Sequence, residues 1–315
     1  MAANSSAIAM TAFQVSRAVI PALAVATVDA SLDLAVRYGS ERSLYGGRVL
    51  DIPHARALLA GAIADFLVAD ALSAVVVRAL HLAPADCLVL TAVSKSLVPQ
   101  LLTSAMDDLS VLFGSTFYAR VPPYDVFEKF LRDLAVVPIG HAGSTACLLT
   151  ILPNLPAWLR RSRRTEATDP ALFRLGDDLD ELAFDRLALG AGAGDPLGAA
   201  LRDPAIRAGF GSGADAPPEA FAAAHRLTLA LAAGAWAGVC AENADSTLTG
   251  DPLVRLAGLQ RVEARLRGGP IVPLDPTAVD RLMEVADDLV ARDVRFAPSA
   301  RDDSPHSATW KEDAP

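Results

Sequence analysis

The stretch YGSERSLYGG, residues 38–47, holds the residues with the clearest chemical potential in this sequence. Arg42 follows Tyr38 by four positions and precedes Tyr45, Gly46 and Gly47. An arginine is always charged and offers a planar fork of donors, which suits an anion. On its own, however, a cation followed by glycines also marks an ordinary helix end, because it complements the helix dipole. The stretch alone leaves both interpretations open.

The elements that must position Arg42 are helices. Hydrophobic residues make up 52% of the 315 residues and aromatic residues only 6%, which favours packed helices over sheets. Apolar residues at three- and four-residue steps predict a long helix over residues 11–38, with Pro21 kinking it or marking its local start. Further helices are predicted over about residues 52–82, 86–114, 124–137 and 144–152. Short connections between them predict an all-α, up-down helical bundle.

The organisation of the chain follows from shifts in composition. Residues 160–170, RRSRRTEATDP, change abruptly to charged and turn-forming residues, and helical spacing returns beyond them. We therefore expect an N-terminal extension (1–10), the bundle (11–160), a linker (161–170), a second helical unit (171–296) and a disordered tail (297–315).

Charge and cysteine content exclude several classes of protein. The formal net charge of −9 offers no basic surface for nucleic acid, so we expect no nucleic-acid partner. Cys87, Cys147 and Cys240 lie far apart without a C-x-x-C pair, which predicts no disulfide framework and no metal site, and fits a reducing cytoplasm. No positive region precedes the first apolar residues, so the N-terminus does not read as a secretory signal.

One stretch resembles a membrane span in length. Residues 134–159 contain no Asp, Glu, Lys or Arg and are followed by RRSRR. Prolines and glycines at positions 138, 140, 143, 153 and 156 interrupt the stretch, and the uninterrupted remainder is too short to cross a bilayer. We expect no transmembrane segment.

Four motifs in order resemble the C-terminal helical domain of acyl-CoA dehydrogenases over about residues 11–152. The first is a helix that opens with Phe13 and Arg17 and ends in Tyr38, Arg42, Tyr45 and Gly46, similar to the family's Tyr-x-x-x-Arg-x-x-Phe-Gly. The others are DIPHARALLAGAIADF, then AVSKSLVPQLLTSAMDDLSVLFGSTFY, which resembles an Ala-Lys helix leading to a glycine-rich turn, and VFEKFLRDL. Four motifs at the family's spacings are far more specific than any one of them.

The resemblance implies roles for particular residues. The family's arginine at the place of Arg42 contacts the pyrophosphate of FAD, often FAD bound mainly by another subunit, with Ser43 and Tyr45 beside it. Gly114 stands in the family's glycine-rich turn, and Arg17 at the place of an arginine near the acyl thioester. FAD is therefore the implied cofactor, and an acyl thioester of coenzyme A or a carrier protein the implied substrate.

The departures from the family pattern concern the catalytic base. Many members read Ile-x-Glu-Gly-Thr after the Arg-Asp pair, whereas this chain reads VVPIGHAGSTACLL. A gapless alignment puts His141 at the place of the Glu. A one-residue insertion would instead align Ala142, Gly143 and Ser144 with Glu, Gly and Thr, which places Ser144 toward the flavin. His141 could serve as a base near neutral pH, or could be a hydrogen-bonded structural group. Phe117 replaces a glycine of the glycine-rich turn.

The family's N-terminal and middle β domains are not represented in these residues. The leading hypothesis is a subunit that gives the helical half of a flavin-dependent acyl-thioester dehydrogenase, with a flavin-bearing partner subunit or within a homo-oligomer. The alternatives are a non-catalytic pseudo-subunit or interaction module, and a truncated remnant of a longer gene.

Overall fold

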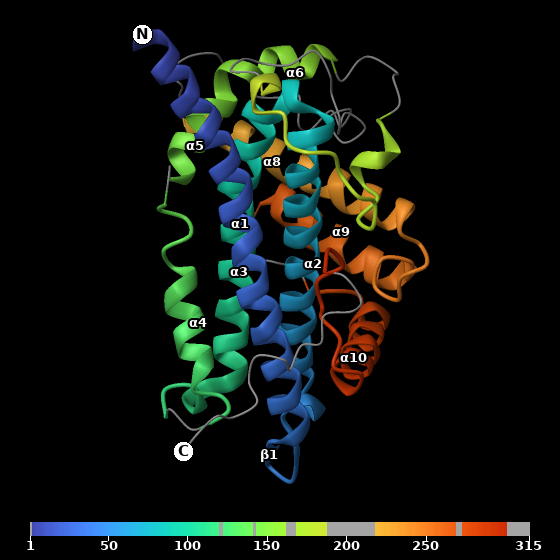
Figure 1. Ribbon diagram of the computed structural model, residues 1–315. Coiled ribbons are helices and arrows are strands. Elements are labelled where there is room, and N and C mark those ends of the chain that lie inside the picture. Colours follow the sequence, from blue (N-terminus) through green and yellow to red (C-terminus); the bar gives the residue numbers. More distant parts are fainter. Residues whose placement is uncertain are drawn as a thin grey trace.

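The long helices of the chain run alternately up and down. The structure, a computed structural model, describes residues 2–119, 122–140, 143–161, 168–187, 218–268 and 273–300. Helix α1 (Ala2–Glu41) leads through a short hairpin to α2 (Pro53–Leu82), and α3 (Cys87–Phe113) returns beside both. The shorter α4 (Val126–Leu134) and α5 (Ser144–Ile151) lie along the edge of these three, and α6 (Leu155–Arg161) follows at the upper end (Figure 1). The predicted all-α, up-down bundle is confirmed.

A proline marks the start of one of these helices, and two other prolines lie inside helices without ending them. Pro53 occupies the first turn of α2, where its missing N–H would lack a partner in any case. Pro21 and Pro99 lie inside α1 and α3, and both helices continue through them. The predicted N-terminal extension, from residue 2 onward, is the first part of α1.

The apolar faces of the long helices are mostly used within the protein. Three helical stretches are long and apolar enough to span a bilayer by length and composition: Ile8–Glu41, Pro53–Leu82 and Pro84–Thr116. In their most apolar windows 89% of the second and 83% of the third are buried inside the protein, but only 56% of the first. Burial against neighbouring helices thus accounts for the hydropathy of α2 and α3. That the chain has no transmembrane segment stays a prediction.

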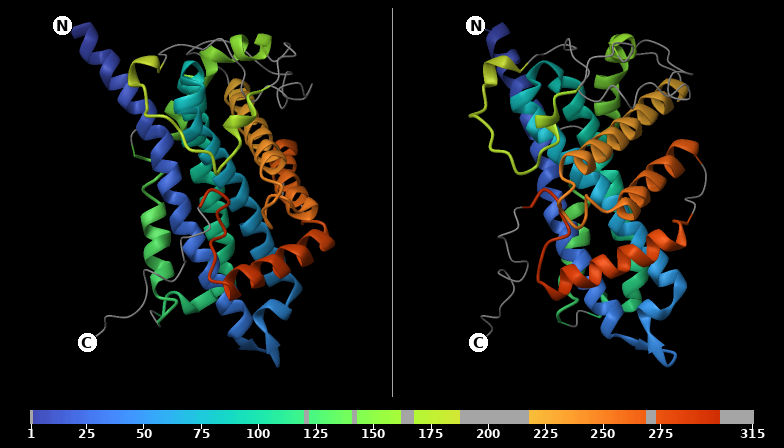
Figure 2. Two further views of the ribbon diagram at one scale, coloured as in Figure 1. Left: turned by 45° about the vertical axis from the view of Figure 1, so that its right-hand side comes forward. Right: turned by 90° about the vertical axis from the view of Figure 1, so that its right-hand side faces the viewer.

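The helices beyond the bundle pack directly on it. Helix α8 (Pro218–Glu242) and α9 (Pro252–Arg267) contact each other and α2, and α10 (Pro276–Ala291) crosses their lower end. Figure 2 shows all three stacked on one side of the long helices. Buried side chains of α8, α9 and α10 belong to the same hydrophobic cluster as those of α1, α2 and α3. The helices that follow the bundle therefore share its core.

Residues 168–187 differ from expectation. Helical spacing from residue 171 onward predicted a helix, but the segment holds only short 3-10 turns, Pro170–Leu172 and Phe184–Arg186, so that prediction is wrong for residues 171–187. The segment is held by side chains of α2 instead: Arg78 donates to the carbonyls of Ala171 (2.7 Å) and Asp177 (3.0 Å). These bonds hold the non-helical backbone of the segment against α2.

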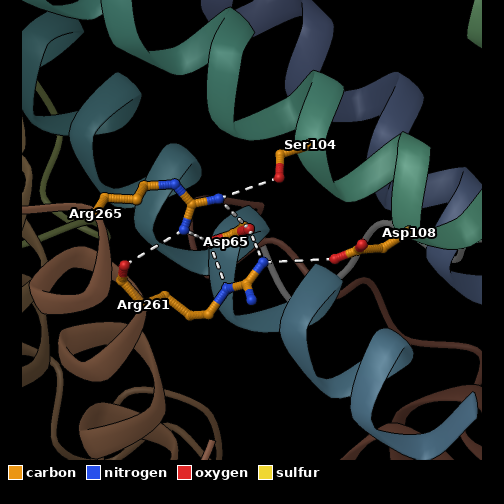
Figure 3. A network of polar contacts seen from close by, with 5 residues as sticks. All are labelled: Asp65, Ser104, Asp108, Arg261 and Arg265. Carbon is orange, nitrogen blue, oxygen red and sulfur yellow. Dashed lines mark hydrogen bonds and ion pairs between the residues drawn. The ribbon is translucent and has the colours of Figure 1, made fainter. Parts of the chain in front are cut away.

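A buried ionic network joins α9 to α2 and α3 (Figure 3). Asp65 of α2, 1% exposed at its side chain, accepts from both guanidinium groups of α9. Arg265 approaches it at 2.7 and 2.6 Å and also donates to Ser104 at 3.1 Å. Arg261 approaches it through Nε at 3.0 Å and lies 3.5 Å from Asp108. Because a buried charge is tolerated only when paired, this network fixes where α9 sits.

Two further buried carboxylates hold the last described residues. Asp29 of α1 accepts from the backbone N–H groups of Phe296 (2.7 Å) and Ala297 (3.0 Å), and Asp70 of α2 accepts from that of Ser299 (3.0 Å). The predicted disordered tail began at residue 297, yet residues 297–299 are tied to the bundle by these bonds; residues 301–315 lie outside the described part.

Candidate functional site

The YGG cluster of residues 45–47 forms a hairpin turn rather than a helix stop. Helix α1 ends at Glu41, and strands β1 (Ser43–Leu44) and β2 (Gly47–Arg48) pair antiparallel with Leu44 opposite Gly47. Tyr45 and Gly46, the two linking residues, both have positive φ, 52° and 86°. A two-residue hairpin loop favours that conformation at both positions, and glycine adopts it without strain. Gly46 is therefore explained by the turn.

Arg42 is presented to the outside by this hairpin. Its backbone is fixed, because its N–H donates to the Tyr38 carbonyl (2.9 Å) and its carbonyl accepts from Val49 (3.0 Å). Its side chain is exposed, as are those of Ser43 and Tyr45. Within the described residues the Arg42 guanidinium makes no ion pair or hydrogen bond. The hairpin thus holds a free cation at the lower end of the bundle (Figure 1).

Tyr38 links this hairpin to the turn that follows α3. Its hydroxyl lies 3.3 Å from the Phe113 carbonyl, to which it donates, and 3.1 Å from Thr116 Oγ1. Its ring packs on Phe113 and Tyr124, with centroids 5.0 and 5.2 Å away. The structure therefore brings the predicted cofactor residue Gly114 to the same end of the bundle as Arg42. Gly114 is exposed, with φ of 55° and no atom within 4 Å of the place of a Cβ.

Phe117, which replaces a family glycine, does not project outward from that turn. It is buried and packs on Phe127, with centroids 5.4 Å apart. Its ring therefore fills the core instead of occupying the outer side of the turn.

A second group of predicted residues lies higher in the bundle, between α1, α3 and α5. Arg17 of α1 is only 8% exposed, and its Nε and Nη1 atoms are buried without a hydrogen-bond partner. Lys95 of α3 is fully buried and donates to the Val137 carbonyl. Burial lowers the pKa of Lys95, and the charge of Arg17 acts in the same direction. These two cations face the buried thiol of Cys147 on α5.

Cys147 reports on the same environment. Burial raises the pKa of its thiol, while the nearby charges of Arg17 and Lys95 lower it. Ser144, predicted to face the flavin, begins α5 one turn earlier and is half-buried. His141 lies outside the described residues. Sequence reasoning did not single out Lys95 and Cys147 as site residues, although Lys95 is the only charged residue of the stretch CLVLTAVSKSLVPQLLTSAM, residues 87–106.

The two groups of predicted residues are far apart. Arg17 lies in the first half of α1 and Arg42 directly follows its last residue, so the helical rise separates them by about 37 Å along the helix axis. They therefore do not contact one small ligand on the same chain. Arg132 and Asp133, the Arg-Asp pair of the motif VFEKFLRDL, form ion pairs within α4, with Glu128 at 3.7 Å and Lys129 at 2.5 Å.

Comparison with known proteins agrees with the motifs. Residues 6–153 match the family model described as acyl-CoA dehydrogenase, C-terminal domain. This segment is an acyl-CoA dehydrogenase C-terminal domain. The chain is also similar to the crystal structure of an acyl-CoA dehydrogenase complexed with FAD from Bacillus anthracis, at 10% sequence identity and a TM-score of 0.56. The similarity covers 91% of this chain and 57% of that one.

At that identity the structural similarity concerns the fold, and the present chain spans little more than half the length of the Bacillus anthracis enzyme. No curated protein matches the sequence. The acyl-CoA dehydrogenase domain ends just before α6, so the family model covers α1 to α5 and not α8, α9 or α10.

Proposed function

We propose that this chain contributes the helical half of a flavin-dependent acyl-thioester α,β-dehydrogenase, and that another polypeptide supplies the β domain that covers the flavin. The match of residues 6–153 to the acyl-CoA dehydrogenase C-terminal domain supports the chemistry. The sheet within the described residues is the two-stranded hairpin alone, which offers no layer to shield a flavin ring from water. These two observations together support a shared active site.

The exposed cation at the hairpin is the observation that carries this proposal. The Arg42 side chain is exposed on a backbone that is fixed on both sides, and Gly46 leaves open space beside it. A forked, permanently charged donor fits the pyrophosphate of FAD, which would approach from another chain because the hairpin faces outward. Arg42, with Ser43 and Tyr45, would hold that pyrophosphate, and Gly114 would leave room for the nucleotide.

The second group of residues would serve the acyl thioester. When bound, FAD supplies the hydride acceptor for α,β-desaturation. Arg17 is buried with unused donors, so it would stabilise negative charge on the thioester carbonyl as the α-proton leaves. His141 is our candidate for the base that takes this proton, since an imidazole titrates near neutral pH.

The test is to copurify the chain with its flavin-bearing partner and to replace Arg42 with Ala. Loss of charge-assisted hydrogen bonds of about 1.5–3 kcal/mol predicts FAD held roughly 10- to 100-fold more weakly by the complex. Flavin absorbance after dialysis measures this independently of turnover. Arg132→Ala, which removes an exposed arginine from α4, is the matched control and should retain FAD. The isolated chain should be colourless, and tight FAD binding by it alone would contradict the shared site.

A non-catalytic role is the second candidate. It is favoured by the absence of any described carboxylate bonded to Arg17 or Lys95, where a proton acceptor is needed. In that case Arg42→Ala would leave both assembly and dehydrogenase activity of the complex unchanged. Loss of activity with intact assembly would instead support the catalytic role.

A further inference from the structure

The space between α1, α3 and α5 carries positive charge that the described residues do not balance. Arg17 of α1 and Lys95 of α3 are both buried on helices that pack against each other, and the buried Cys147 lies on α5, which packs on α3. The charges of both cations act on the Cys147 thiol. The bonds that the structure gives to Lys95 end on a neutral carbonyl, that of Val137, and Arg17 Nε and Nη1 have no acceptor. Two buried like charges therefore stand without a counter-ion in the described part of the chain.

Other acids of these helices are occupied elsewhere. Asp29 of α1 pairs with Arg295, and Asp33 pairs with Arg37 one turn along. Asp108, the nearest paired carboxylate on α3, contacts Arg261, more than three helical turns from Lys95. Within the described residues, therefore, no carboxylate bonds to Arg17 or Lys95.

Helix α5 adds to the positive potential. It begins at Ser144, and the first bond of its ladder runs from the Cys147 N–H to the Gly143 carbonyl (3.1 Å). The N–H groups of the first turn therefore have no partner within the helix, and this end bears partial positive charge. The charges of Arg17 and Lys95 act on the buried thiol of Cys147, so this end of α5 lies in their neighbourhood.

We propose that Arg17 and Lys95 form a binding site for a small monocarboxylate. Burial of an uncompensated charge is unfavourable, and an anion that enters between the two side chains would remove this cost. A planar carboxylate matches the flat guanidinium of Arg17, while the remaining ammonium protons of Lys95 reach a second oxygen. Because both cations are almost completely enclosed, the site selects small ligands such as formate, acetate and propionate. It requires neither flavin nor a partner chain, although it shares Arg17 with the thioester site proposed above.

The experiment uses the full chain without FAD, titrated with sodium formate, acetate and propionate by calorimetry at constant pH and ionic strength. Sodium chloride and sodium phosphate at the same ionic strength are the comparison probes. We expect saturable heats with the carboxylates and a melting temperature that rises with their concentration and levels off, with no such rise in chloride or phosphate.

Variants separate binding from folding. Arg17→Met removes an unpaired buried charge and keeps the volume, so it should fold and should bind acetate at least ten-fold more weakly. Lys95→Met should also weaken binding ten-fold, and Arg132→Met, on the surface of α4, should leave it unchanged. Absence of saturable carboxylate binding, equal binding of chloride or phosphate, or unchanged affinity in Arg17→Met would each overturn the proposal. None of these results bears on whether Arg42 holds FAD.

Discussion

Asp70 should make the stability of this protein depend on pH in an unusual direction. Its side chain lies inside the bundle on α2, where Oδ2 accepts from the Ser299 N–H (3.0 Å) and Oδ1 accepts from the Ser299 hydroxyl. The pKa of this carboxyl is raised from 3.8 to about 6, mainly by burial; the two bonds from Ser299 lower it and nearby Asp29 raises it, and that value already includes both effects.

The sign and size of the effect follow from linkage. Because the folded state binds the proton more tightly than the unfolded state, the contribution to stability is complete below about pH 4 and is lost as the pH rises through about 6. A rise of about two pH units in a pKa corresponds to roughly 3 kcal/mol. At pH 8 the ionised carboxylate of Asp70 therefore costs the folded state free energy of this order.

The substitution Asp70→Asn tests this reasoning. The amide oxygen can still accept from the Ser299 N–H, and the amide nitrogen can donate to the Ser299 hydroxyl, which reverses its role. Without the charge, the free energy of unfolding at pH 8 should rise by up to about 3 kcal/mol. At pH 4 the variant and the natural protein should be nearly equal. Urea unfolding followed by circular dichroism at intervals from pH 4 to pH 8 measures the difference.

The control is Asp29→Asn. Asp29 accepts from two backbone N–H groups through Oδ1 and faces Arg295 through Oδ2 at 3.2 Å. An amide cannot replace the second oxygen toward a guanidinium, so this variant should be destabilised at pH 8. The reasoning is refuted if Asp70→Asn is less stable than the natural protein at pH 8, or if its gain is as large at pH 4 as at pH 8.

Three further predictions concern packing and polar contacts elsewhere. Asp65→Ala leaves the two arginines of α9 buried without their acceptor, so the free energy of unfolding should fall by about 3–5 kcal/mol in urea titrations. Gly258→Ala places a Cβ 2.4 Å from Nε1 of Trp236, and overpacking should lower stability by about 1–3 kcal/mol, read as a lower melting temperature. Tyr38→Phe removes the hydroxyl that bonds the Phe113 carbonyl and should cost about 1 kcal/mol; an unchanged urea midpoint would mean that water replaces it.

The helices of the bundle could be predicted from sequence because each has a local signal. Pro53 opens α2, a glycine follows α3, and apolar residues recur at helical spacing between them. The cluster around Arg42 helped to identify the family, but its hairpin was not predicted. Tyr45 and Gly46 were interpreted as part of a helix end or of the family motif. Only the pairing of Leu44 with Gly47 in the structure reveals the turn.

The contacts between distant segments could not be predicted. Asp65 and Arg261 are separated by almost two hundred positions, and nothing local in either helix indicates a partner. Residues 171–187 have helical spacing, but the carbonyls of Ala171 and Asp177 accept hydrogen bonds from Arg78 of α2. This contact exists only in the folded chain. Charged residues within apolar stretches of helices, such as Asp70 and Lys95, were the available signal for buried polar contacts.

The position of the donors for Asp29 and Asp70 bears on how the protein is made. Both acids are synthesised early, whereas the N–H groups that satisfy them belong to residues 296–299. In a nascent chain that has produced every bundle helix, Asp29 and Asp70 still lack these donors and remain open to water. The native core therefore closes only when the last described residues are made. A chain that ends before residue 296 would leave Asp29 and Asp70 without their donors. Such an incompletely closed core is a feature by which cellular quality control could recognise an incomplete chain.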